Sequence, residues 1–244
     1  MGIRIAFIFI FTLFFINKGS SQFQSEQVAS QPASSIYKGA IEYGLQHSAN
    51  ITRFYGEYPT HTFETWEDSY EHSRSRFTMD LGAFVNVYLT PKITILSEIS
   101  FSFMGDNSLF TRTVYQDVGK FETKVYPTFA LRYLKIPVSV NYLIRDGFFL
   151  QGGAYFATLL SASAYDSFWY GNAIDVDNIN AIDAGLIAGF GMSTKIVMVG
   201  FRYSYGLTEV FSEDNSNLHN GVYQIVAQWK LYSDVRKRKK YEND

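Results

Sequence analysis

The stretch at residues 134–160, LKIPVSVNYLIRDGFFLQGGAYFATLL, alternates apolar and polar side chains with a period of two. This period is typical of a β-strand with one apolar and one polar face, because successive side chains of a strand point to opposite sides. Arg145-Asp146-Gly147 separates two such runs, and Asp-Gly favours a tight hairpin turn. Each run is about as long as the 9–11 residues with which a tilted strand crosses a bilayer. The segment therefore predicts a β-hairpin whose apolar face meets either lipid or a protein core.

The same alternation recurs along the chain and predicts eight strands in all. The six further strands begin near Ile36, Phe77, Ile93, Ile182, Val197 and Tyr223. Short turns are expected at residues 90–92, 145–147 and 193–195, and long polar loops at residues 47–76, 104–124, 162–180 and 207–220. Short turns that alternate with long loops are typical of bacterial outer-membrane barrels. Pro137 lacks the N–H that a strand ladder needs, so we expect a bulge or local bend there.

The alternative is a soluble eight-stranded barrel, such as a lipocalin-like carrier, whose apolar faces point inward. Two features favour the membrane. Rings with a polar tip belong at the bilayer interface, and many aromatic residues stand near the expected strand ends: Tyr37, Tyr43, Phe77, Tyr88, Phe101, Tyr142, Phe148, Tyr203, Tyr205, Tyr223, Trp229 and Tyr232. The interior of an eight-stranded barrel is narrow, and the polar faces are rich in glycine: Gly82, Gly153, Gly185, Gly189, Gly191, Gly200 and Gly206.

The polar faces also carry a few charges of both signs. Inside a narrow lumen such charges must pair, since an unpaired buried charge is costly. We therefore expect a structural ion-pair network in the lumen, formed by Glu42, Asp80, Glu98, Lys135, Asp183, Arg202 and Lys230. A selective pathway through Glu98 and Arg202 is the functional alternative to this structural plug. The expected fold class is all-β, an eight-stranded antiparallel transmembrane β-barrel with up-and-down connections.

The segments that flank the expected barrel have compositions of their own. Residues 1–21 combine Arg4, an apolar run and small residues, which is the pattern of a secretory signal peptide. Residues 22–35 are rich in Gln, Ser and Ala and predict a flexible leader. The barrel is expected over residues 36–232, followed by a basic periplasmic tail over residues 233–244. An even number of strands puts both termini on the periplasmic side.

The residue types that carry chemistry are sparse. The formal net charge of −2 argues against a nucleic-acid partner, and the absence of cysteine excludes a disulfide scaffold. The four histidines, His47, His61, His72 and His219, are expected in loops without a metal-ligand spacing. We therefore expect no catalytic residues, no cofactor and no metal site, and the chain is not expected to be an enzyme.

Three segments resemble a known family. YLKIPVSVNYLIRDGFFLQGGAYFATLLSA, IDAGLIAGFGM and VGFRYSYGLTEV are similar to the PorT-like outer-membrane β-barrel proteins of Gram-negative bacteria, over about residues 36–232. The resemblance implies an outer-membrane location and eight strands. It implies no single function, although the founding member serves secretion of proteins across the outer membrane.

These observations lead to one functional hypothesis and one alternative. The chain is expected to be a small outer-membrane barrel without a catalytic site, acting as a structural or accessory component of an envelope or protein-secretion system. The alternative is a narrow porin-like channel for ions or small solutes. The expected partners are outer-membrane lipid, the barrel-assembly machinery and a protein of an envelope or secretion complex.

The assignment of faces can be tested at Leu186, which is expected to point toward lipid near mid-span. Replacing it with arginine should destabilise the barrel by about 2–4 kcal/mol, because a charge at the bilayer midplane is poorly solvated. Urea unfolding in lipid vesicles measures this change. Unchanged assembly and stability of Leu186→Arg would mean that the two faces are assigned the wrong way round.

Overall fold

The computed structural model describes residues 39–56, 61–62, 66–116, 119–145, 147–165, 173–174, 179–211 and 217–234. These residues form twelve β-strands of one mixed-length antiparallel sheet. Within the same ranges, no helix is long and apolar enough to span a membrane. The signal peptide, the leader and the basic tail predicted from the sequence lie outside the described residues, apart from Ser233 and Asp234.

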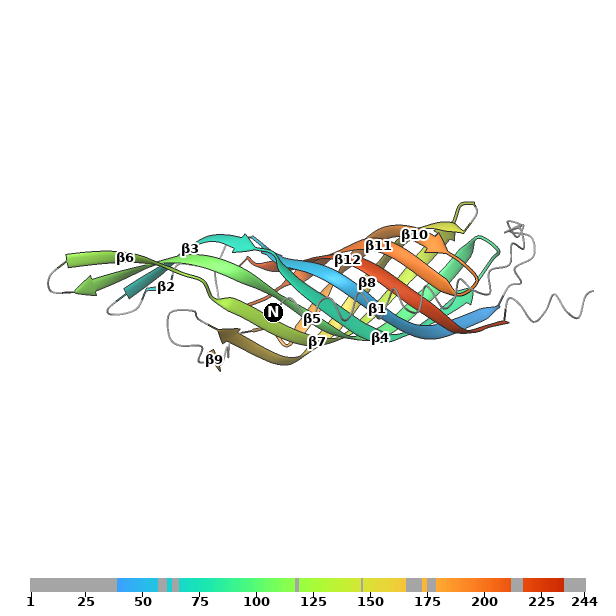
Figure 1. The fold of residues 1–244 in the computed structure, drawn as a ribbon, viewed down its shortest axis with the longest axis horizontal. Helices are drawn as coiled ribbons and strands as arrows, with labels where there is room; N and C mark the ends of the chain where they lie inside the picture. Colours follow the sequence, from blue (N-terminus) through green and yellow to red (C-terminus); the bar gives the residue numbers. More distant parts are fainter. Residues whose placement is uncertain are drawn as a thin grey trace, which may run out of the picture. The chain divides into compact units, whose positions relative to one another are not determined.

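Eight of the strands close into a barrel, which confirms the predicted fold class (Figure 1). Each pairs with its neighbours in chain order, and the first strand pairs with the last. The barrel strands are β1 (Ile41–Tyr55), β4 (Arg76–Tyr88), β5 (Ile93–Gln116), β7 (Thr128–Leu143), β8 (Phe148–Tyr165), β10 (Ile182–Ser193), β11 (Val197–Glu209) and β12 (His219–Ser233). A closed ring satisfies the backbone hydrogen bonds of every barrel strand, as hydrocarbon surroundings require.

Four further strands lie where the sequence predicted loops, and the loop predictions are wrong in this respect. They are β2 (His61–Thr62), β3 (Trp66–Arg74), β6 (Gly119–Val125) and β9 (Ala173–Ile174). The outer part of β5 pairs with β3 on one side and with β6 on the other. These three strands continue past the barrel wall as a sheet (Figure 1). The alternation of apolar and polar residues ends where the membrane-spanning part of the strands ends, but backbone pairing continues beyond it. The period of two therefore does not predict this sheet.

Two histidines expected in loops belong to barrel strands instead. His47 lies within β1, and His219 is the first residue of β12. Both fall inside predicted loops, 47–76 and 207–220, because the barrel strands run further than their most regular alternation. Of the other two, His61 lies in β2 and His72 in β3.

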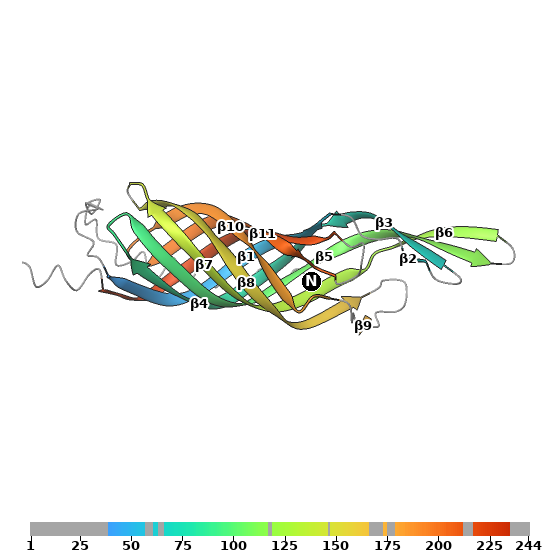
Figure 2. The same ribbon diagram turned by 180° about the vertical axis from the view of Figure 1, so that it is seen from behind.

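The three short connections confirm the predicted turns. They join β4 to β5, β7 to β8 and β10 to β11, so they lie at one end of the barrel, called the turn end below (Figure 2). In two of these turns a threonine hydroxyl accepts hydrogen bonds from backbone N–H groups that follow it in the chain. The Thr90 hydroxyl accepts hydrogen bonds from the backbone N–H of Lys92 and Ile93, and the Thr194 hydroxyl accepts from Ile196 and Val197. Such side-chain turns hold the backbone reversal without tertiary support.

The apolar faces point out of the barrel, as the sequence predicts. Leu186 is 55 % exposed and Phe190 is 58 % exposed, whereas Lys135 on the polar face of β7 is only 1 % exposed. One aromatic residue departs from the expected interfacial position. Tyr88 is buried in the lumen, where its hydroxyl donates to Glu42 Oε2 at 3.1 Å.

Glycines make room in the lumen for large rings of neighbouring strands. A Cβ at Gly185 would lie 2.6 Å from the Tyr155 ring, and one at Gly191 would lie 2.6 Å from Phe149 Cζ. Both distances are too short for carbon atoms that are not bonded. The glycines of the polar faces therefore decide where Tyr155 and Phe149 can lie.

Pro137 does not cause the expected bulge. Pairing between β5 and β7 has the same register on both sides of it, from Ser97–Val138 to Ser100–Lys135, with the pairs between them missing. The register shift of β7 lies at Arg132/Tyr133 instead. The proline therefore interrupts the ladder locally, because it has no N–H to donate.

Adding one methyl group at Gly185 tests the packing of the lumen. Gly185→Ala should destabilise the barrel by about 1–3 kcal/mol, because the new Cβ overlaps Tyr155 and the backbone of β11. Gly152→Ala is the matched control, since no atom lies within 4 Å of the position its Cβ would take. Both free energies of unfolding are measured by urea titration in the same vesicles. Equal values for the two variants would contradict the packing described here.

Candidate functional site

The lumen is the candidate site, and an apolar cluster closes it at each end. At the loop end, opposite the turn end, the buried cluster contains Phe54, Met104, Phe129, Leu131, Tyr133, Tyr155, Ala157, Ala164, Ile187, Val210, Phe211, Leu218 and Val222. At the turn end, Phe84, Leu96, Phe149 and Met198 pack together. Charged and amide side chains fill the space between the two clusters, and one further ion pair, Glu42–Lys230, lies at the turn end itself.

A bidentate ion pair crosses the middle of the lumen. Arg202 Nη1 and Nη2 donate to Glu98 Oε1 and Oε2 at 2.7 and 2.9 Å. Glu98 belongs to β5 and Arg202 to β11, which stand four places apart in the ring of eight and therefore on opposite walls. Both side chains are buried, and Gln228 Nε2 donates a further bond to Glu98 Oε1 at 3.2 Å. Two parallel charge-assisted bonds fix this contact in both distance and direction.

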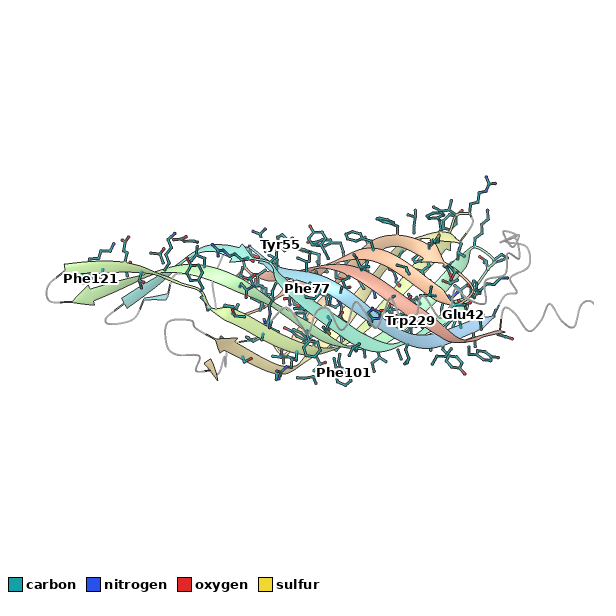
Figure 3. The ribbon with its side chains drawn as sticks, in the orientation of Figure 1. Glu42, Tyr55, Phe77, Phe101, Phe121 and Trp229 are labelled. Carbon is teal, nitrogen blue, oxygen red and sulfur yellow. The ribbon has the colours of Figure 1, made fainter. Side chains whose placement is uncertain are left out.

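A second ion pair lies at the turn end, between Glu42 and Lys230 (Figure 3). The Lys230 Nζ–Glu42 Oε1 distance is 3.1 Å, and both side chains are nearly buried. Lys230 Nζ also donates to Ser193 Oγ and to the Thr194 carbonyl. The pair therefore ties the first barrel strand to the last and to the β10–β11 turn.

The other two carboxylates of the expected network are held by neutral donors. Asp80 accepts hydrogen bonds from Asn50, Ser102 and Gln224 at 2.7–2.9 Å. Asp183 accepts from three donors at 2.8–3.1 Å, namely Tyr155, Thr208 and Asn220. Neither carboxylate has a cationic partner within 4 Å among the described residues.

Lys135 has no hydrogen-bond acceptor for its ammonium group within the described part of the chain. Its Nζ lies 4.2 Å from the centre of the Tyr155 ring, over the face of the ring. The Tyr155 hydroxyl in turn donates to Asp183. The structure thus joins Glu98 with Arg202 and Glu42 with Lys230, and it gives Asp80, Asp183 and Lys135 other partners.

Neutral amides complete the site, and the sequence reasoning overlooked them. Asn50, Gln46, Gln224 and Gln228 are buried on the lumen faces of β1 and β12 and bond to one another or to the carboxylates. A signal was present for three of them, since Gln46, Gln224 and Gln228 occupy polar positions of the predicted alternation, whereas Asn50 lies in the loop predicted at residues 47–76. An amide both donates and accepts, so it can connect charges that do not meet directly.

Little space remains between these side chains. One cavity of about 10 Å³ is bordered by Asp80, Glu98, Lys135 and Arg202, and another of about 10 Å³ by residues that include Phe149 and Gln228. A cavity of this size holds about one water molecule. Neither cavity is large enough for a hydrated ion.

The described residues contain no group of three His, Cys, Asp or Glu side chains that could hold a metal ion. Several acidic residues of the first predicted loop, among them Glu57 and Glu64, lie outside the described residues. Of the lumen carboxylates, Glu98 pairs with Arg202 across the barrel, whereas Asp80 and Asp183 accept hydrogen bonds from neutral donors.

The sequence comparisons identify the family. The model of the outer membrane protein beta-barrel domain matches residues 22–212. The chain belongs to this family. It is therefore a small outer-membrane β-barrel protein. The curated proteins include no sequence that matches it.

Solved structures with a similar fold include several small barrels. Ail, the attachment invasion locus protein of Yersinia pestis, is 10 % identical over 80 % of this chain and 100 % of its own, with a TM-score of 0.44. Neisserial surface protein A (NspA) is 11 % identical over 78 % of this chain and 97 % of its own, with a TM-score of 0.44. OprG from Pseudomonas aeruginosa is 8 % identical over 80 % of this chain and 96 % of its own, with a TM-score of 0.37.

Charge-removing substitutions test the bridge across the lumen. Arg202→Met should cost about 3–5 kcal/mol of unfolding free energy, because it leaves Glu98 buried without its partner. The double variant Glu98→Leu/Arg202→Met should recover most of that loss. Urea titrations of the two single variants and the double variant give the coupling energy. Additive losses would show that the two side chains stabilise the barrel independently.

Lys135→Met is the matched comparison for Arg202→Met, because it also removes a buried positive charge from the lumen. Lys135 has no acceptor to leave unpaired, so its replacement by an apolar side chain of similar length should cost less than about 1 kcal/mol. A loss as large as that of Arg202→Met would show that the contact with the Tyr155 ring is as important as the ion pair.

Proposed function

We propose that this protein is a closed, non-conducting barrel that anchors a protein contact in an envelope or protein-secretion system. The observation that carries the proposal is the Glu98–Arg202 bridge between two apolar clusters. A channel for ions or small solutes needs a continuous polar path, whereas here both ends of the lumen are filled by buried apolar side chains. The proposal assigns the protein no catalytic step and gives the lumen ion pairs a structural role.

The proposed contact surface is the loop-side sheet, which we define as β3, residues 107–116 of β5, and β6. It carries the exposed ring of Phe121 beyond the barrel wall, 53 % exposed (Figure 3), and Tyr126, which directly follows β6, is 41 % exposed. Alternating charges surround these rings, as in the exposed pairs Lys120–Glu122 and Lys124–Glu71. Aromatic side chains framed by charges are common at protein–protein interfaces.

The edge of β6 supports the same proposal. Within the described residues, β6 forms a ladder with β5 alone, and no described strand lies along its other edge. Proteins normally cover or shorten such edges, because an open edge accepts a strand from another chain. A partner that adds a strand to β6 would gain backbone hydrogen bonds and contact Phe121 at the same time.

The orientation of the barrel is part of this proposal. The turn end would face the periplasm, together with both termini, and the loop-side sheet would stand outside the cell. Residues 1–21 would be removed as a signal peptide, and the leader and the tail at 233–244 would remain in the periplasm. The PorT-like resemblance of the β7–β8 hairpin supports a role in protein secretion, with lipid and the barrel-assembly machinery as further partners.

Single-channel recording of the purified protein in planar bilayers tests whether the lumen conducts. The unmodified protein should give no steady conductance steps. A variant that lacks the bridge and one ring of the turn-end cluster (Glu98→Ala, Arg202→Ala, Phe149→Ala) is the matched control and should leak. Steady conductance of the unmodified protein would overturn the proposal and favour the narrow channel.

Crosslinking in living cells tests the proposed contact surface. A photoreactive amino acid at Phe121 should capture a protein partner, because this ring projects from the loop-side sheet. The same group at Phe190, which is 58 % exposed on the lipid face, is the control and should give no such product. Identical patterns from the two positions would contradict a partner site on the loop-side sheet.

A further inference from the structure

An ionisable side chain faces outward in the membrane-spanning part of β1. Alternation along β1 places His47 on the same face as Leu45, Ala49 and Ile51, of which Leu45 is 55 % and Ile51 is 49 % exposed. The outward apolar side chains of this strand extend from Ile41 to Ile51. His47 therefore lies near the middle of the lipid-facing run, where titratable residues are rare and costly.

The imidazole ring of His47 has one close neighbour. It stacks on the indole of Trp229 from β12, with ring centres 4.5 Å apart and an angle of 17° between the planes. Stacking engages the flat face of the imidazole and leaves both ring nitrogens at its edge. Neither nitrogen has a hydrogen-bond partner among the described residues. Acyl chains cannot supply one, so this position needs a polar group from another molecule.

The surroundings of His47 allow close approach. On the β12 side its register partner is Ala227, and Ala49 is the next outward residue on β1, whereas Leu81 lies opposite it on β4. Small residues at membrane interfaces let two backbones come near each other. Trp229 and Leu45 form the next outward register pair toward the turn end. We call the area formed by His47, Ala49, Ala227 and Trp229 the seam face, because β1 and β12 close the barrel there; Trp229 is labelled in Figure 3.

We propose that the seam face is the interface between two copies of this chain in the membrane. The neutral imidazole carries one donor and one acceptor, so it is complementary to a second copy of itself. In a two-fold dimer the N–H of one His47 would donate to the unprotonated nitrogen of the other, across facing alanines. A second copy thus gives one nitrogen of each ring a hydrogen-bond partner from residues already at the interface. This inference requires only the barrel in its membrane, and it is independent of the partner proposed for the loop-side sheet.

The chain contains no cysteine, so single-cysteine crosslinking has no background. Ala227→Cys in oxidised outer membranes should give a disulfide-linked species of twice the monomer mass. Val138→Cys is the matched control, since Val138 is 48 % exposed on β7, four places away from β12 in the ring. A yield from Ala227→Cys no higher than from Val138→Cys would overturn the proposal. A crosslinked species of any other mass would overturn it as well, by assigning the face to a different protein.

The role of the imidazole is tested separately by His47→Phe, which keeps a ring for stacking on Trp229 and removes both nitrogens. Self-association in lipid vesicles, followed by energy transfer between labelled copies, should weaken by about tenfold, the order expected for one hydrogen bond in a membrane. His47→Gln, which keeps a donor and an acceptor, should retain more of the association. Equal association of His47→Phe and the unmodified protein would show that the imidazole does not hold the dimer.

Discussion

Closure of the backbone hydrogen-bond ring is the constraint on which the rest of this structure depends. In hydrocarbon no water can satisfy an open strand edge, so the eight membrane strands must pair in a circle. The pairing of β1 with β12 completes that circle and brings together residues far apart in the chain, among them Glu42 and Lys230. Once the ring is closed, every second side chain of each strand points into the narrow lumen. These inward side chains together must fill it.

The narrow interior explains the composition of the lumen faces. Rings such as Tyr155 and Phe149 fit only because glycines of the neighbouring strands lie beneath them. Charges can be accommodated because partners reach them from the opposite wall, as Arg202 does for Glu98, or because amides and hydroxyls surround them. Such a filled lumen stabilises the barrel, and the two proposed contacts lie on its surfaces, the loop-side sheet and the lipid-facing wall.

The loop-side sheet and the seam face differ in the sequence signal that indicates them. The loop-side sheet follows from strands that continue beyond the membrane, where polar side chains carry no period-two signal. His47 has a signal in the sequence, because it occupies an outward position between Leu45 and Ala49, although a histidine amid polar residues is also typical of a loop. Its stacking on Trp229 depends on the β1–β12 pairing, which connects the two ends of the chain.

The sequence by itself determined the eight strands, their two faces and the short turns. Each of these depends on a local period of two or on the turn preferences of a few residues. Only the tertiary structure decided which charges meet, that Lys135 faces a ring instead of a carboxylate, and that apolar clusters close both ends. These features depend on the register and closure of the barrel, which bring opposite walls together, and no local pattern contains that information.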